Sequence, residues 1–288
     1  MQSFVVFADG SANLPKSMLE GISLLPCEYT VNGAPHVYWG DVDSFDAHSF
    51  YEGLKRGDVI QTTLLNTQLF ISHFEQALEK GLDVIYVSMS SGISGTYNAA
   101  RIAATELMEK YTDRFIHIVD SLGCGFGSGI LAVQAAHLAS LGVKAREAAA
   151  KIDEQVLKTC QYFTVDDLNF LKKTGRVGGV TAMIGTVLNI KPILFGDHTG
   201  HIISCGKVRG RRKAVEALAD KYEEKRIRTG EQMVCISHGN CLDDARMLAG
   251  LVEKITPDVS VTICQHEPFS GSHVGPGMLG LFFRGRER

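Results

Sequence analysis

The sequence predicts an α/β protein of two domains: an N-terminal three-layer α/β/α domain with a parallel sheet, and a C-terminal α+β domain with a mixed sheet. Short apolar runs alternate with helical segments up to residues 160–166, which is typical of a parallel sheet covered by helices on both faces. Two extended segments around a Gly/Asp turn at residues 190–205 then break the alternation. The 288 residues suffice for two modest domains, which we place at 1–162 and 163–288.

In the first half, each element is predicted from a local pattern. Residues 4–8 are apolar and predict a strand, and Pro15 after Asn13 suits the first turn of a helix. The further expectations, in order, are an extended segment over 22–31, a loop or hairpin over 33–43, a helix over 44–55, a hydroxyl-rich loop over 60–67, a helix to about residue 80, a strand over 84–87, a helix over 98–110, a strand over 115–119, a helix from the glycine-rich segment 123–129 through Leu138 and an amphipathic helix over 144–160.

The second half mixes hairpin and helical patterns. Asp166 and Asp167 precede a short helix, and residues 190–195 and 201–205 predict a hairpin. We expect helices at about 212–228 and 242–254, strands at 233–237 and 259–264, and a Gly/Pro loop with an apolar tail over 268–283.

Composition narrows the classes of function. The chain is 45% hydrophobic and 21% charged, and its net charge of −3 gives no reason to expect non-specific nucleic-acid binding. No apolar run approaches the roughly 20 residues of a membrane span, and residues 1–9 lack the basic start of a signal peptide. The seven scattered cysteines form no Cys-x-x-Cys pair, and the histidines lack ligand-like spacing. We therefore expect a cytoplasmic protein without metal or cofactor.

The strongest chemical signal is a serine- and glycine-rich loop, residues 90–96, between the strand at 84–87 and the helix at 98–110. The first N–H groups of a helix have no partner inside it and favour an anion. The loop matches neither a Walker A motif nor a Gly-x-Gly-x-x-Gly motif. An ordinary turn capped by Ser94 explains it equally well.

Other candidates are individually weak. Asp9 ends the first strand, where open α/β sheets bind ligands, but it would serve equally as a cap of the next turn. Thr62 and Thr63 are strand-edge residues or ligand donors, and His273 is a candidate for hydrogen bonding or proton transfer. The basic cluster at 207–213 is explained by a solvated helix start, or by a phosphate or acidic partner, since positive charge is poorly placed at a helix N-terminus.

Eight motifs, taken together and in order, resemble the DegV family, the fatty-acid-binding subunits of bacterial fatty acid kinase. Residues 90–97 match that family's most specific loop nearly residue for residue, and the resemblance spans essentially the whole chain. Two departures stand out: Gly10 occupies a position that is usually serine, and Leu64-Leu65-Asn66 replaces Ser-Gln-Pro. The matching segments are 9–14, 62–63, 90–97, 120–121, 171–176, 191–194, 207–209 and 273–277.

The resemblance implies one long-chain fatty acid in a tunnel between the two domains. A partner kinase would transfer the γ-phosphoryl group of ATP to its carboxylate, giving an acyl phosphate for phospholipid synthesis, and transient membrane-surface contact would serve lipid exchange. The residues expected at the carboxylate are Thr62, Thr63, Ser91, Gly92, Ser94, Gly95 and His273, and those expected at the partner or phosphate are Arg176, Lys207 and Arg209.

Two alternatives belong to other classes of protein. A stand-alone serine hydrolase acting on lipid esters would use Ser91 or Ser94 with His273 and either Asp9 or Asp120, although no Gly-x-Ser-x-Gly elbow is present. A structural or regulatory protein with an empty cleft would carry no lipid on purification.

Overall fold

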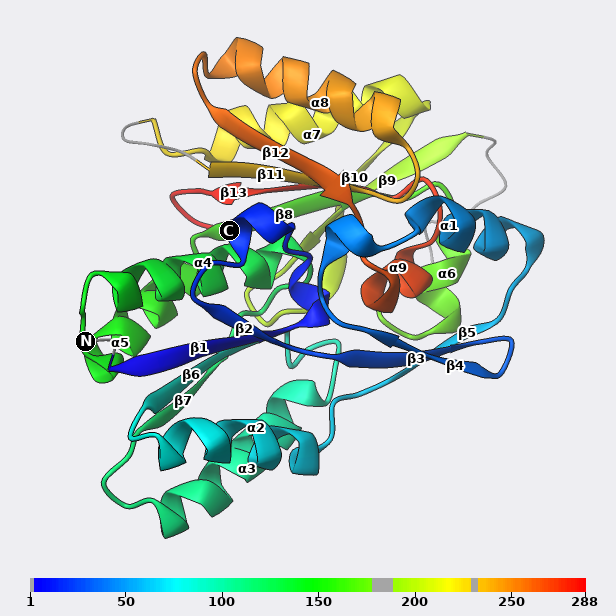
Figure 1. Ribbon diagram of the computed structural model, residues 1–288. Helices are drawn as coiled ribbons and strands as arrows, with labels where there is room; N and C mark the ends of the chain where they lie inside the picture. The colour runs from blue at the N-terminus through cyan, green and yellow to red at the C-terminus, as the bar shows by residue number, and fades with distance from the viewer. Residues whose placement is uncertain (1–2, 178–188, 229–232) are drawn as a thin grey trace.

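The computed structural model describes residues 3–177, 189–228 and 233–288, and its strands form three sheets. A four-stranded sheet has the order β2-β1-β6-β7, a six-stranded sheet the order β10-β9-β8-β13-β11-β12, and a three-stranded sheet the order β4-β3-β5. In Figure 1 the layers run from α2 and α3 through the four-stranded sheet, α4 and α5, and the six-stranded sheet to α7 and α8. The predicted parallel sheet followed by a domain with a mixed sheet is confirmed.

The four-stranded sheet is parallel throughout, and its two faces bury different cores. Side chains alternate along a strand, so Val6 of β1 packs towards α4 and α5 while the next residue, Phe7, packs towards α2 and α3. The elements are β1 (Phe4–Asp9), β2 (Ile22–Leu25), β6 (Asp83–Ser88), β7 (Ile116–Asp120), α2 (Thr67–Glu79), α3 (Thr96–Lys110), α4 (Phe126–Ser140) and α5 (Ala145–Val156).

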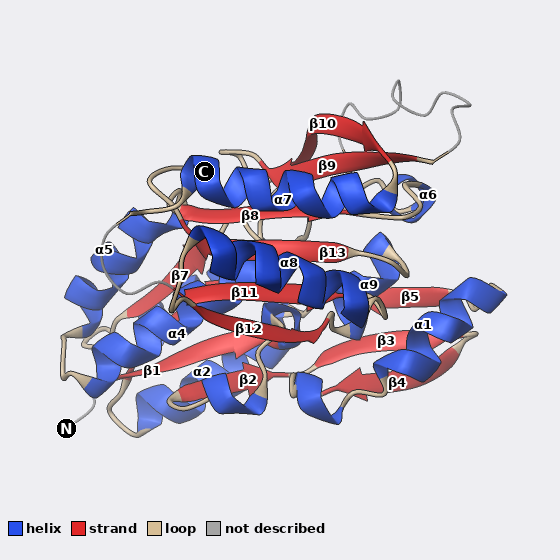
Figure 2. Cartoon of the chain, turned by 90° about the horizontal axis from the view of Figure 1, so that it is seen from above, coloured by secondary structure: helices blue, strands red, loops and turns tan. Residues whose placement is uncertain are grey.

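The six-stranded sheet is mixed: β11 and β12 are parallel, and the other neighbours are antiparallel. Helices α7 and α8 cover one face (Figure 2), and the other face receives α4, with the Phe126 and Phe282 rings 5.9 Å apart. The elements are β8 (Thr159–Thr164), β9 (Ile190–Gly196), β10 (Ile202–Arg209), β11 (Met233–His238), β12 (Ser260–Gln265), β13 (Leu279–Arg284), α7 (Arg211–Lys225) and α8 (Leu242–Ile255). The boundary predicted between residues 162 and 163 falls inside β8.

The region of the three-stranded sheet corrects two local predictions and decides a third. The extended segment 22–31 is two strands, because Pro26, which has no N–H to donate, separates β2 from β3. Residues 60–63 form β5 and not a loop. Of the loop or hairpin predicted for 33–43, the structure has the second strand of a hairpin at 34–38, whose first strand, 27–31, precedes the predicted range. The elements here are β3 (Cys27–Val31), β4 (Ala34–Tyr38), β5 (Ile60–Thr63) and α1 (Ala47–Arg56).

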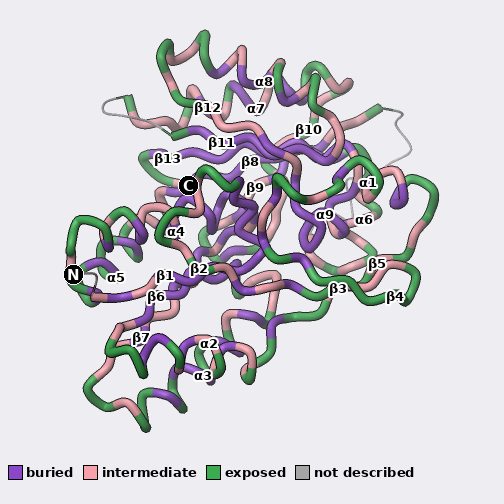
Figure 3. The backbone as a smooth tube through the Cα atoms, in the orientation of Figure 1, coloured by how far each residue is buried: buried purple, intermediate pink, exposed green. Residues whose placement is uncertain are grey.

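The Gly/Pro loop expected from residue 268 is wrong over 268–274, whereas residues 275–278 are a loop and the apolar tail at 279–283 is confirmed. Residues Pro268–Val274 form α9, whose N-cap Glu267 accepts hydrogen bonds from the N–H groups of Phe269 and Ser270. The tail is β13, which lies between β8 and β11. Both elements are mostly buried (Figure 3), as is the short α6 (Asn169–Lys173) at Leu171. Among the described helices, none combines the length and apolar character that a membrane span requires.

Candidate functional site

A cavity of about 400 Å³ lies where loops of the parallel sheet meet the six-stranded sheet. This volume falls within the roughly 300–1,000 Å³ of small-molecule sites. Most of the lining is apolar, with a few polar side chains among it. The lining residues are Thr62, Leu64, Met89, Ser90, Ile93, Ser94, Gly95, Leu122, Gly123, Cys124, Gln161, Phe163, Leu171, Arg176, Gly196, Gly200, Ile202, His266, Phe269, Ser270, His273, Val274, Met278 and Phe282.

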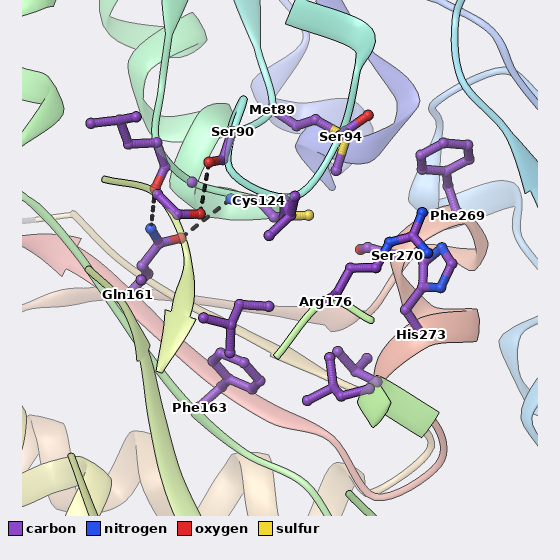
Figure 4. Close-up of a pocket in the computed structure, with 18 of the residues that line it drawn as sticks. Met89, Ser90, Ser94, Cys124, Gln161, Phe163, Arg176, Phe269, Ser270 and His273 are labelled. Carbon is purple, nitrogen blue, oxygen red and sulfur yellow. Dashed lines mark hydrogen bonds between the residues drawn. The ribbon is translucent and has the colours of Figure 1, made fainter. Parts of the chain in front are cut away.

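Four half-buried polar residues form what we call the mouth of the cavity: Thr62, Ser94, Arg176 and His273. Thr62 lies on β5 and His273 on α9, and Thr62 Oγ1 is 3.0 Å from His273 Nε2. In Figure 4, Ser94, Arg176 and His273 lie on the same side of the cavity. The Nδ1 atom of His273 is buried and has no hydrogen-bond partner in the described part of the chain.

His273 is a neutral imidazole in this setting. Burial, and secondly the positive charge of Arg176, lower the pKa of His273 to about 4. A neutral imidazole donates from one ring nitrogen and accepts at the other. When Nε2–H donates to Thr62 Oγ1, the single hydroxyl hydrogen of Thr62 is free to donate into the cavity.

The serine loop contributes Ser90, Ile93, Ser94 and Gly95 to the lining, of which Ser94 and Gly95 were predicted. The N-cap of α3 is Gly95, and Ser94, one residue earlier than the cap itself, accepts a hydrogen bond from the Thr96 N–H at 3.2 Å. Its hydroxyl hydrogen is directed to Thr96 Oγ1, at 3.0 Å. Ser94 thus supports the helix start, as the simpler interpretation expected, and also faces the cavity.

Five of the predicted site residues lie outside the lining. Thr63 is exposed beside Thr62, as alternation along β5 requires. The Ser91 N–H donates to Asp120 Oδ1 at 3.1 Å, and Gly92 packs so closely on the backbone of Gly200 that a Cβ atom there would lie 2.7 Å from it. The other two are Lys207 and Arg209, both exposed on β10.

We call the opposite side of the cavity the closed end. None of its residues was predicted from the sequence as part of the site. Its buried polar side chains are Ser90 and Gln161, which Figure 4 places away from His273. Ser90 donates to the Gly200 carbonyl at 2.8 Å and accepts from the Gly92 N–H at 3.0 Å. Ser90 lies in the serine loop but was not among the predicted site residues. The signal for Gln161 was an amide side chain in a strand whose other residues are Thr, Cys, Tyr and Phe.

Helix α9 is held by buried polar contacts. His266 lies between two serine hydroxyls, with Nδ1 2.9 Å from Ser237 Oγ and Nε2 2.9 Å from Ser270 Oγ. Burial lowers the pKa of His266 to about 3 and raises that of Glu267, the N-cap of α9, to about 7. These contacts fix the helix that carries His273.

Asp9 lies outside the lining, buried at the end of β1. It accepts hydrogen bonds from the Ser11 N–H at 2.9 Å, from the Ser11 hydroxyl and from the Tyr86 hydroxyl. Its role here is therefore that of a turn cap, one of the two roles expected from the sequence.

The serine hydrolase alternative finds no support in this geometry. A nucleophilic serine needs a base within hydrogen-bond reach. Nε2 of His273 meets Thr62, and in the described part of the chain neither Ser91 nor Ser94 hydrogen-bonds to His273. Nor do the described residues include any group of three or more His, Cys, Asp or Glu side chains that could hold a metal ion.

Comparison with known proteins identifies the family to which the chain belongs. Residues 3–286 match the family model described as "Uncharacterised protein, DegV family". The chain belongs to the DegV family. A DegV domain-containing protein of Clostridium perfringens is 35% identical over 286 residues, which cover 99% of this chain and 98% of the relative.

Solved DegV structures share the whole fold. DegV of Bacillus subtilis, described as a fatty acid binding protein, has a TM-score of 0.81 at 26% identity and covers 99% of this chain and 100% of its own. A DegV-family protein of Ruminococcus gnavus, refined with vaccenic acid, has a TM-score of 0.87 at 21% identity, with 98% and 100% coverage.

The two departures from the DegV motifs have separate structural settings. A Cβ atom on Gly10 would lie 2.8 Å from the Tyr38 ring, so glycine here allows close packing of Tyr38 outside the cavity. Leu64 lines the cavity and is 49% exposed, while Asn66 caps α2 by accepting the Leu69 N–H at 2.9 Å. Only the Leu64 change alters the lining, by adding an apolar side chain near Thr62.

Proposed function

We propose that this chain binds a long-chain fatty acid in the cavity, with the carboxylate at the mouth and the acyl chain directed towards the closed end. The observation that carries the proposal is the Thr62–His273 pair, which leaves the hydroxyl hydrogen of Thr62 for a ligand, on the wall of a mostly apolar cavity. The fatty acid binding described for DegV of Bacillus subtilis supports the same assignment.

The acyl chain supplies most of the affinity in this proposal. Each buried methylene contributes about 0.8 kcal/mol. The carboxylate must be hydrogen-bonded, because an unpaired charge in an apolar site is costly. The hydroxyl groups of Thr62 and Ser94 are uncharged donors, so they hold the carboxylate without neutralising it as a tight arginine pair would.

A partner kinase completes the proposed function. Thr62 and Ser94 are half-buried, so a carboxylate held there lies near the surface. An oxygen of that carboxylate attacks the γ-phosphorus of ATP bound to the partner, and ADP leaves as the acyl phosphate forms. Arg176 at the mouth, with Lys207 and Arg209 exposed on β10, provides positive charge for the partner or the phosphate. The acid itself would be exchanged during transient contact with a membrane surface.

Lipid analysis tests the binding step. We expect mass spectrometry of an organic extract from the purified protein to yield about one fatty acid per chain. After lipid removal, the protein should bind an added fatty acid with the same stoichiometry. The absence of lipid in the extract together with no binding of added acid would refute the proposal.

Reconstitution tests the kinase step separately. With ATP, bound fatty acid and a bacterial fatty acid kinase catalytic subunit, hydroxylamine should trap the acyl phosphate as a hydroxamate, and omission of either protein should abolish it. Turnover of a p-nitrophenyl acyl ester by this chain alone, lost in His273→Ala, would instead favour the hydrolase alternative.

A further inference from the structure

We propose that the side-chain amide of Gln161 is the stop against which the methyl end of the acyl chain rests, so that this residue sets the longest chain accepted. The inference depends on the proposed function, since it assumes an acid oriented with its carboxylate at the mouth. It assigns a specificity-determining role to a residue of β8.

The position of Gln161 fits a stop. The residue is 6% exposed, whereas Leu64 near Thr62 is 49% exposed, so the cavity runs from an open side to an enclosed one. Figure 4 places Gln161 with Ser90 on the opposite side of the cavity from Arg176 and His273. An acyl chain that enters carboxylate-last therefore approaches Gln161 with its methyl end.

The amide of Gln161 is fixed in place by hydrogen bonds at both of its polar atoms. Nε2 donates to the Leu122 carbonyl at 2.8 Å, and Oε1 accepts from the Cys124 N–H at 3.2 Å. Because both bonds are to backbone atoms, the side chain cannot swing aside without leaving buried polar groups unpaired. The wall is therefore rigid.

Three glycines shape the space that the amide occupies. A Cβ atom at Gly127 would lie 2.5 Å from Gln161 Oε1, one at Gly123 would lie 3.0 Å from the same atom, and one at Gly196 would overlap Nε2. These glycines come from the β7–α4 segment and from β9, so the backbone encloses the amide from two sides. The amide therefore has no room to retreat towards these glycines when an acyl chain presses on it.

The bound amide also explains why the closed end is a wall and not a second polar subsite. An acyl chain that reaches it gains burial for every methylene up to the amide, about fourfold in affinity each. One further methylene must either displace the amide from its backbone partners or remain exposed at the mouth. Affinity should therefore rise with chain length and then stop rising.

The test is a chain-length series of saturated fatty acids on delipidated protein. Gln161→Ala removes four heavy atoms, so we expect the longest chain that still gains affinity to increase by about two to three carbons. The matched control is Gln134→Ala on α4, outside the lining, which should leave the length limit and the affinities unchanged. Thr62→Val should lower affinity for every chain length and leave the limit in place.

The outcomes separate the two proposals. Failure of the wild-type protein to bind any acid refutes the proposed function, whereas binding with an unchanged limit in folded Gln161→Ala refutes the stop. Where Gln161→Ala does not fold, Gln161→Asn, which keeps the amide and is one methylene shorter, must raise the limit by about one carbon. In the wild-type complex, a nuclear Overhauser effect must connect the 13C-labelled terminal methyl to the Gln161 side-chain amide, and its absence overturns the inference.

Discussion

The mouth and the closed end of the cavity both carry polar side chains, but at the mouth one of them, Thr62, has a hydroxyl hydrogen left for a ligand. At the mouth, the Thr62 hydroxyl has a single described partner, His273, and it keeps its own hydrogen when Nε2–H of His273 donates to it. At the closed end, Ser90 and Gln161 are each bonded to two backbone groups. The comparison teaches that unused bonding capacity, more than polarity, distinguishes a binding group from a wall.

The reason is energetic. A hydrogen bond to a charged group contributes about 1.5–3 kcal/mol, which the free hydroxyl hydrogen of Thr62 can supply to a carboxylate. The amide of Gln161 has already spent its hydrogen bonds on the backbone and stabilises the fold instead. The two ends should therefore respond differently to substitution: the mouth in ligand affinity, and the closed end in stability and chain-length preference.

The largest expected effect lies behind the closed end, at Arg288. Its guanidinium donates to backbone carbonyls near the ends of strands in both the four-stranded and the six-stranded sheet. Arg288→Ala should therefore lower the free energy of unfolding by about 2–4 kcal/mol. These carbonyls belong to Ser121, Leu122, Val156, Thr159 and Asp197. Urea unfolding of the delipidated protein measures the change.

The control for Arg288 is Arg286→Ala, because Arg286 is exposed and its side chain donates only to the Glu224 carbonyl among the described residues. We expect a change within about 0.5 kcal/mol there, as for an ordinary surface site. Equal effects at the two arginines would mean that the closed end is not held together in the way the hydrogen bonds indicate.

Thr62→Val should produce the largest effect on ligand affinity. The variant keeps the shape of the side chain and removes its hydroxyl, and a hydrogen bond to a charged group contributes about 1.5–3 kcal/mol. Fatty acid affinity should fall about 10- to 100-fold in a fluorescence displacement titration. Thr63→Val is a matched control on the exposed side of β5 and should bind as the wild type does. Identical affinities in both variants would remove Thr62 from the site.

Ser94→Ala should have a smaller effect than Thr62→Val. The Ser94 hydroxyl already donates to Thr96 Oγ1, so it must exchange that bond for one to the carboxylate. The net loss is then about 1 kcal/mol, or about fivefold in affinity. Ser91→Ala, at an exposed position outside the lining, should have no effect in the same titration. A loss in Ser91→Ala larger than that in Ser94→Ala would contradict this geometry.

Local sequence patterns predicted most of the fold but could not order its strands in space. The alternation of β1, β6 and β7 with helices, and the β9–β10 hairpin, depend on neighbouring residues and are confirmed. The last strand, β13, lies between β8 and β11, a placement that only long-range packing decides. Its neighbouring helix α9 was hidden by glycine and proline, which usually indicate a loop.

The site was predictable only as a set of candidates. Spacing could not choose between Thr62 and Thr63, because the choice depends on which face of β5 meets the cavity. Gln161 has no motif around it, and its role depends on residues 122–124 and 196, which are distant in sequence. The roles of Thr62, Ser94 and His273 in holding a carboxylate stay predictions that the variants above decide.

The smallest expected effect is the pH dependence of stability that comes from the protonation of His273. The pKa of His273 is about 4 in the folded chain and about 6.5 when exposed, so between these values the unfolded state binds more protons. Lowering the pH through this window must therefore destabilise the wild type relative to His273→Gln. Allowing for partial solvent exposure, we expect about 0.5 kcal/mol between pH 7.5 and pH 6, from urea unfolding of both delipidated proteins. If lowering the pH instead stabilised the wild type relative to His273→Gln, His273 would be held as a cation. The carboxylate would then pair with a positively charged imidazole and not with neutral donors.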